Sequence, residues 1–335
     1  MEEKRLIDKI RESSGHTDIG SKEDGAIMKM KNIGGRHLII KERSIYEMIM
    51  ADDIDPNRTN INLPSTIQKL IIDKGTDSEI VSRILLTAMT LFSPEYIIET
   101  VNCTKIISLS IDLLSEVSIL EKEISEYIFI ESSACKEYEE RKIKNLSFKV
   151  PSIISLESKC KTIFQKADHV EQILMDIVVN FYTNLGLEKK SHFPKLQEKL
   201  KVKYGETDPF VQFLSKNLYF MQVIRELRNG FDHRLEHTKV FDFELQPNGK
   251  IIAPTIELTH KNNKLKRTSL SDFLDKVLKN IVYIIELTFV FLAEKNTVKN
   301  NLHYSVKPIP EEKRQNKFVK FSFWTPLGVG GFYFQ

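Results

Sequence analysis

The 335-residue sequence has little of several features that mark whole classes of protein. It holds only three cysteines (Cys103, Cys135 and Cys160), and none of them has a partner at metal-ligand spacing. This pattern argues against a disulfide framework and fits a reducing compartment. The longest apolar run, residues 281–293, is interrupted by Glu286. Such a run is too short for a membrane span and indicates a buried helix.

Two further absences narrow the possible functions. The opening stretch MEEKRLIDKIRE lacks the apolar segment of a signal peptide, so we expect a cytoplasmic protein with no membrane partner. No Gly-x-Gly-x-x-Gly or Gly-Lys-Ser/Thr pattern follows Gly34-Gly35, which disfavours a loop that cradles phosphates. The alternation of residues 26–42 around these glycines predicts a hairpin instead.

Charge is distributed unevenly along the chain. Residues 1–150 hold 21 lysines and arginines against 26 acids, a net charge of −5. Residues 151–335 hold 28 against 20, a net charge of +8. A basic C-terminal half suggests a polyanionic partner there, although an ordinary scatter of surface charge gives the same count.

The patterning predicts a mainly α protein, α+β overall. We expect residues 1–148 to form a mostly helical N-terminal domain of unknown role, with a possible hairpin. A charged stretch at 135–145, followed by Val-Pro-Ser at 150–152, marks its end. Residues 149–300 are expected to form a helical bundle with an inserted β-hairpin. Helical periodicity covers 156–186, 193–205, 207–230 and 269–295, and alternation covers 240–258.

Residues 301–335 form an aromatic C-terminal tail. Aromatic side chains interleaved with lysines can stack on nucleic-acid bases. We favour packing against the chain's own core, because so many apolar rings need cover.

Two chemical motifs overlap in the stretch RELRNGFDHRLEH at 225–237. One is Arg-Asn-x-x-x-His, formed by Arg228, Asn229 and His233, and the other is His-x-x-Glu-His, formed by His233, Glu236 and His237. Each is expected roughly 0.02 times by chance in a chain of this composition. Frequency therefore cannot decide between them, and context must.

The context of Arg228 is unusual. On a helical projection of residues 207–231 it falls inside the apolar arc, where a leucine is expected. A guanidinium there requires an anion, such as Asp168 or Glu171 of the preceding helix, or a functional pocket. His233 lies about 140° from Arg228 on an unbroken helix. A break at Gly230 would turn it back toward the arginine.

The alternative motif has the spacing of a zinc hydrolase. His233 and His237 could be ligands and Glu236 the base. That assignment needs a third ligand, but the sequence has no recognisable ligand helix. It also needs a longer helix for the motif, but a strand already begins near Val240.

The helix that ends in IRELRN, followed three residues later by a histidine, resembles the HEPN superfamily over residues 155–295. That family's motif is an arginine followed by a polar residue, with a histidine after four to six intervening residues, and it is matched here by Arg228, Asn229 and His233. The resemblance implies a metal-independent endoribonuclease that needs no cofactor and acts as a homodimer, often as a toxin or an abortive-infection effector against phage. Other members only bind RNA or dimerise, and this remains an alternative here, as does zinc hydrolysis.

The residue types suit this chemistry. A histidine can move the proton of a ribose 2′-OH near neutral pH, an arginine can stabilise the charge on phosphorus, and Asn229 can orient either group. We expect RNA as substrate and allow for a neutralising antitoxin or a sensor partner. Nearby basic residues that could hold the RNA backbone are Arg225, Arg234, Lys264, Lys266 and Arg267.

Overall fold

The computed structural model of the protein describes residues 4–13, 17–143, 149–188, 191–260, 263–299, 302–328 and 330–335. The chain divides into two compact units: residues 1–111 with 297–335, and residues 112–296. The helix α5 (Cys103–Ile143) passes from the first unit into the second. The division therefore differs from the one expected at 148/149 and 300/301. The charged stretch that suggested a linker forms the last turns of α5 as far as Ile143.

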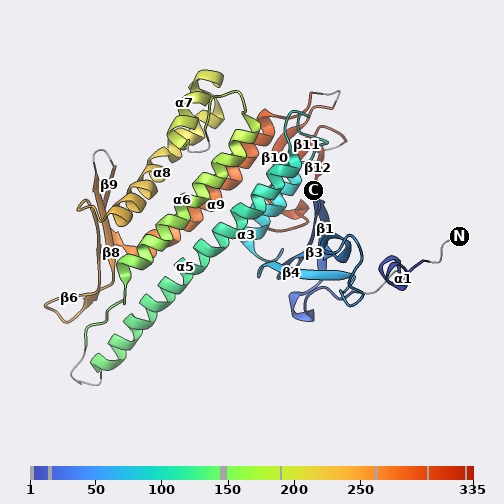
Figure 1. The fold of residues 1–335 in the computed structure, drawn as a ribbon. Coiled ribbons are helices and arrows are strands. Elements are labelled where there is room, and N and C mark those ends of the chain that lie inside the picture. The colour runs from blue at the N-terminus through green and yellow to red at the C-terminus, as the bar shows by residue number, and fades with distance from the viewer. Residues whose placement is uncertain are drawn as a thin grey trace. The chain divides into compact units, whose positions relative to one another are not determined.

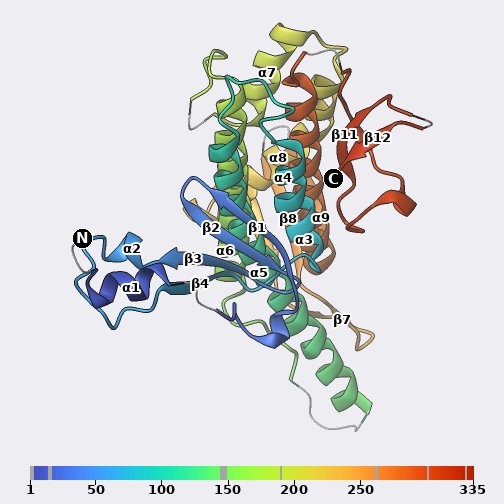
Figure 2. The same ribbon diagram turned by 90° about the vertical axis from the view of Figure 1, so that its right-hand side faces the viewer.

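The first unit contains a four-stranded antiparallel sheet in the order β1-β2-β3-β4 (Figure 2). Its strands are β1 (Ile27–Ile33), β2 (Arg36–Lys41), β3 (Ile45–Met50) and β4 (Thr66–Ile72). The hairpin predicted around Gly34-Gly35 is confirmed, with φ values of 61° and 88° that suit a tight two-residue turn.

The expectation of a mostly helical N-terminal domain with at most a hairpin is wrong for this region. The apolar residues Ile67, Leu70 and Ile71 have i, i+3, i+4 spacing that also fits a helix. Pairing of β4 with β3 overrides that local pattern. Short helical segments flank the sheet: α1 (Leu6–Glu12), η1 (Lys22–Asp24) and α2 (Ala51–Ile54).

A helical stretch follows the sheet, made of α3 (Glu79–Val81), the π-turn η2 (Ser82–Leu86) and α4 (Thr87–Leu91). The predicted apolar stripe is buried here: Ile80, Ile84, Leu85, Ala88 and Leu91. The apolar spacing of this segment therefore predicted correctly which of its residues are buried.

The aromatic tail packs on the first unit, as favoured from the sequence. It contains β10 (Ser305–Pro308), η3 (Glu311–Lys313), β11 (Phe321–Thr325) and β12 (Phe332–Phe334), and the strands pair in that order. The ring of Tyr96 lies 4.8 Å from that of Phe323 and 5.2 Å from that of Phe334, centroid to centroid. The Lys307 ammonium lies 3.1 Å from the centroid of the Trp324 ring. These aromatic and lysine side chains of the tail therefore find contacts within the chain itself.

The second unit is built on long helices that run beside one another (Figure 1). They are the greater part of α5, α6 (Leu156–Phe181), α8 (Pro209–His233) and α9 (Leu270–Lys295), with the shorter α7 (Phe193–Tyr204). The predicted starts of α8 and α9 are confirmed. The Asp208 carboxylate accepts a hydrogen bond from the Phe210 N–H at 2.9 Å, and the Ser269 hydroxyl caps α9. No helix among the described residues has an apolar stretch that could cross a bilayer.

The core between these helices is aromatic and aliphatic. Phe164 of α6 stacks on Phe231 of α8 with ring centroids 5.7 Å apart, and Phe273 of α9 lies 6.2 Å from Phe164. One of these rings comes from α8, which carries the motif, and the others come from α6 and α9, so together they fix the end of α8.

The predicted hairpin insertion is present between α8 and α9. Strand β5 (Thr238–Phe241) pairs with β8 (Thr255–His260), and β6 (Glu244–Leu245) pairs with β7 (Ile251–Ile252). A further strand, β9 (Asn263–Ser269), pairs with β8 and was not expected. Its residues alternate in exposure along part of its length, a period-2 pattern that its many basic side chains disguise.

Gly230 lies inside α8 where strand β5 approaches the helix. A Cβ on this residue would lie 2.5 Å from the Cβ of Thr238 and closer still to its hydroxyl. Only a glycine allows this approach, so the residue's role here is close packing.

We therefore predict that Gly230→Ala destabilises the protein by about 1–3 kcal/mol, because the new methyl group displaces β5. Urea unfolding would measure the loss. The double variant Gly230→Ala/Thr238→Gly removes the three atoms nearest to the new methyl group and should recover part of the lost stability. Equal losses in the single and double variants would contradict the packing explanation.

Candidate functional site

The helix α8 carries the Arg-Asn-x-x-x-His motif without interruption. It runs through Gly230 to His233 and ends where Arg234 adopts a left-handed conformation, with φ of 50°. The expected break at Gly230 is therefore wrong. Gly230 has helical geometry, and its lack of a side chain lets β5 pack against the helix at this point. His233 consequently stays about 140° around the helix from Arg228.

His233 is exposed at the end of α8. Within the described part of the chain it has no hydrogen-bonding or ion-pair partner. One chain alone does not bring this imidazole to the guanidinium of Arg228.

Arg228 lies against acids, as its place in the apolar arc requires. Its Nε lies 3.0 Å from the Asp232 carboxylate and 3.8 Å from that of Asp168 on α6. Its Nη1 donates a hydrogen bond of 3.0 Å to the Asn229 side-chain oxygen. The side chain as a whole is 33% exposed, and Asn229 orients its guanidinium.

Asp232 connects this arginine to α6. The Gln165 amide donates to its carboxylate at 2.6 Å, and the Lys161 ammonium lies 3.3 Å away. Burial alone would raise the pKa of Asp232. The contacts with Gln165, Lys161 and Arg228 outweigh burial and hold that pKa below its ordinary value.

A second arginine of α8 is tied to the same helix. The Arg225 guanidinium donates to the buried Glu171 carboxylate at 2.9 Å, and the Phe193 N–H donates to the same oxygen at 3.1 Å. Arg225, proposed from the sequence as an RNA contact, therefore has its charge engaged inside the fold.

The other proposed RNA-contacting residues lie directly after α8 and on β9. Arg234 is exposed, and Lys264 and Lys266 are exposed on β9. Arg267 covers the ring of Phe241 and forms an ion pair of 2.7 Å with Glu244. Arg234, Lys264 and Lys266 are thus the better-placed cations for a phosphate backbone.

The His-x-x-Glu-His residues do not form the zinc site of the alternative hypothesis. Because α8 ends at His233, the two histidines do not lie on one helical face, and His233, Glu236 and His237 do not bring ligand atoms together. His237 instead lies close to Glu226 and His260, two residues that neither motif contains. Burial, then the neighbouring His260, lowers the pKa of His237, although Glu226 opposes this shift.

A signal for His260 did exist in the sequence. The predicted hairpin pairs residues near 240 with residues near 256, and extending that register places residue 260 close to residue 237. The observed pairing of Thr238 with Leu258 has this consequence.

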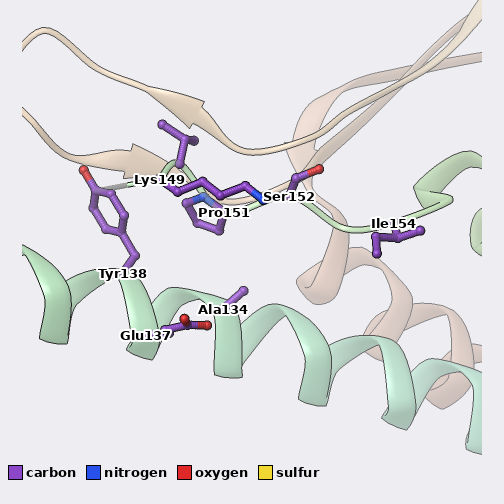
Figure 3. A pocket seen from close by; sticks show the side chains of 8 residues that line it. Ala134, Glu137, Tyr138, Lys149, Pro151, Ser152 and Ile154 are labelled. Atoms are coloured by element: carbon purple, nitrogen blue, oxygen red, sulfur yellow. The ribbon is translucent and has the colours of Figure 1, made fainter. Parts of the chain in front are cut away.

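A cavity of about 390 Å³ lies elsewhere in the second unit (Figure 3). Residues of α5 and of the segment 149–154 line it, and they include Glu137, Tyr138, Lys149 and Pro151. The Tyr138 hydroxyl donates to the Gly249 carbonyl at 3.0 Å. None of the motif residues lines this cavity.

Comparison with known proteins adds no identity. No known protein family, no curated protein and no solved structure matches the chain. The chemistry of the site is therefore argued from its own residues.

We predict that Asp232→Asn lowers the free energy of unfolding by about 1–3 kcal/mol at neutral pH, because it removes the nearest anion of Arg228. Since folding lowers the pKa of Asp232, its contribution is complete above the ordinary carboxyl pKa of about 3.9. It is lost as pH falls through the lower folded value. The gap between the wild type and the variant should close over that range.

Urea unfolding across pH would test this. Asp275→Asn is the matched control, since Asp275 forms an exposed i,i+4 pair with Lys279 at 2.6 Å. Its removal should change stability by less than about 0.5 kcal/mol. A similar effect of the two substitutions would contradict the role assigned to Asp232.

Proposed function

We propose that the protein is a metal-independent endoribonuclease of the HEPN type, with Arg228, Asn229 and His233 as its catalytic residues. One observation carries the proposal. A partly exposed arginine, oriented by Asn229, lies on the same helix as an exposed histidine that has no partner in the described part of the chain.

The reaction is cleavage of RNA by its own 2′-hydroxyl. A neutral His233 takes the 2′-OH proton as the 2′-oxygen forms its bond to phosphorus. Arg228 stabilises the extra negative charge on the phosphorane. The bond from phosphorus to the 5′-oxygen breaks, and a protonated His233 of a second copy protonates that oxygen. The products are a 2′,3′-cyclic phosphate and a 5′-hydroxyl.

A homodimer follows from the assignment of the base and the acid to the His233 side chains of two copies. The 140° between Arg228 and His233 on an unbroken helix keeps the two groups of one chain apart. A two-fold axis near the end of α8 would let the arginine of one copy face the histidine of the other and would provide both an acid and a base.

Nearby charge suits an RNA backbone. Arg234 is exposed at the end of α8, and Lys264 and Lys266 are exposed on β9. The Lys264 backbone meets Tyr219 near the middle of α8, so the three cations are spread along the helix, where they can neutralise phosphates. By its resemblance to HEPN proteins we further propose a role as a cytoplasmic toxin or anti-phage effector, controlled by an antitoxin or sensor partner. A HEPN-like module that binds RNA or dimerises without cleavage is the alternative.

The purified protein should cleave mixed cellular RNA in excess EDTA and leave 2′,3′-cyclic phosphate ends. His233→Ala and Arg228→Ala should each lower the rate by about 10²–10⁴, the usual contribution of a positioned acid–base group. Gel analysis and mapping of the ends would measure this. His169→Ala removes another exposed histidine, on α6, and should leave the rate unchanged.

Three outcomes would count against the proposal. Cleavage abolished by EDTA would indicate metal chemistry. Intact cleavage in the His233 variant would remove the assigned acid and base. A folded protein that binds RNA and never cleaves it would favour the non-catalytic alternative.

Light scattering at micromolar concentration should give the mass of a dimer. Mixing the inactive Arg228→Ala and His233→Ala proteins should restore part of the activity, because a mixed dimer keeps one arginine and one histidine. A strict monomer with full activity on RNA would refute the shared site.

A further inference from the structure

Three side chains converge beside the last turns of α8. Glu226 comes from the helix itself, His237 from the connection to β5, and His260 from the last position of β8. Their potential ligand atoms all lie within 4.8 Å of one another. The His260 Nδ1 is 2.6 Å from the Glu226 carboxylate, and the rings of His237 and His260 stack with centroids 4.3 Å apart.

The backbone fixes this meeting. The Thr259 N–H donates to the His237 carbonyl at 2.8 Å, which continues the pairing of β5 with β8. The two imidazoles are therefore held together by strand register. Figure 1 shows β8 beside the end of α8.

Two features point to an unsatisfied ligand set. The Nε2 atom of His237 is shielded from solvent and has no hydrogen-bonding partner. Among the described residues, Glu226 has His260 as its ion-pair partner, and no lysine or arginine lies within 4 Å of its carboxylate. A cation brought to this place would meet one carboxylate and two imidazoles.

A second group of similar composition shares the first feature, since the His192 Nδ1 is also shielded and has no hydrogen-bonding partner, but it lacks the second. Asp168, Glu171 and His192 also bring ligand atoms together. Arg225 already forms an ion pair with Glu171, and Arg228 lies 3.8 Å from Asp168. Two guanidinium groups thus take the place that a metal ion would fill.

We propose that Glu226, His237 and His260 bind one zinc ion per chain. Two imidazoles and one carboxylate form a donor set that zinc favours, and water can complete the tetrahedron. The ion ties α8 to the connection that follows it and to β8, so it holds the segment that carries the end of the motif helix. This role is structural and separate from RNA cleavage.

Binding requires a local rearrangement. Zinc bonds of about 2.0 Å in a tetrahedron place ligand atoms about 3.3 Å apart, closer than the present limit of 4.8 Å. The stacked rings, now 11° from parallel, must also tilt, since a ligated metal lies in the plane of each imidazole. The His260 Nδ1 and the Glu226 carboxylate, now 2.6 Å apart, must also separate to this spacing if both bind the ion.

Isothermal titration of the EDTA-treated, desalted full-length protein with Zn²⁺ should give one site per chain, confirmed by metal analysis after dialysis. His260→Asn should weaken binding by more than the about 10–100-fold that loss of an outer hydrogen-bonding partner costs. Glu226→Gln, which keeps shape and removes charge, should weaken it at least tenfold. His192→Ala, in the second group, should bind as the wild type does.

Circular dichroism would verify that each variant is folded, and Co²⁺ in place of zinc should give the visible absorption of a tetrahedral ion. The proposal is overturned if the wild type binds no zinc, if both His260→Asn and Glu226→Gln bind it normally, or if His192→Ala loses it. These measurements use no RNA. An inactive protein that binds zinc would count against the ribonuclease alone, and an EDTA-resistant ribonuclease without zinc would count against this site alone.

Discussion

The buried carboxylates of Asp168 and Glu171 on α6 determine where the arginines of α8 lie. The two acids are three residues apart, and so are their partners Arg228 and Arg225, which pair with them in antiparallel order. A buried charge without its partner costs several kcal/mol, so neither helix can slide past the other by a turn. The same ion pairs that set the register of the bundle also place Arg228 where solvent can reach it.

The placement of Arg228 has a consequence for its chemistry. The negative charges of Asp232 and Asp168 weaken the positive potential around the Arg228 guanidinium. Asn229 and Asp232 hold its orientation. Such an arginine is preorganised, and a phosphate must compete with two carboxylates for it. RNA would gain most where a second copy excludes water, because electrostatic interactions strengthen as the local dielectric falls.

Local patterns in the sequence predict the elements of this fold better than their ends and partners. The starts of α8 and α9 follow from their capping residues, and the first hairpin from Gly34-Gly35. Strand β4 has apolar spacing that fits a helix equally well, so only its pairing with β3 decides. The end of α8 was misread because Gly230 serves a contact with Thr238, and no local signal distinguishes that role from a helix stop.

The two overlapping motifs share His233, and a single turn of the backbone separates this residue from His237. Arg234, in a left-handed conformation, ends α8 directly after His233 and reverses the chain toward β5. His233 therefore stays on the exposed end of the helix, while His237 turns inward to meet His260 across the strand pair. A spacing that places two histidines on one face of a helix places them on opposite sides of a turn once the helix stops between them. The hydrogen bonding of β5 with β8 thus assigns the two histidines to different surroundings.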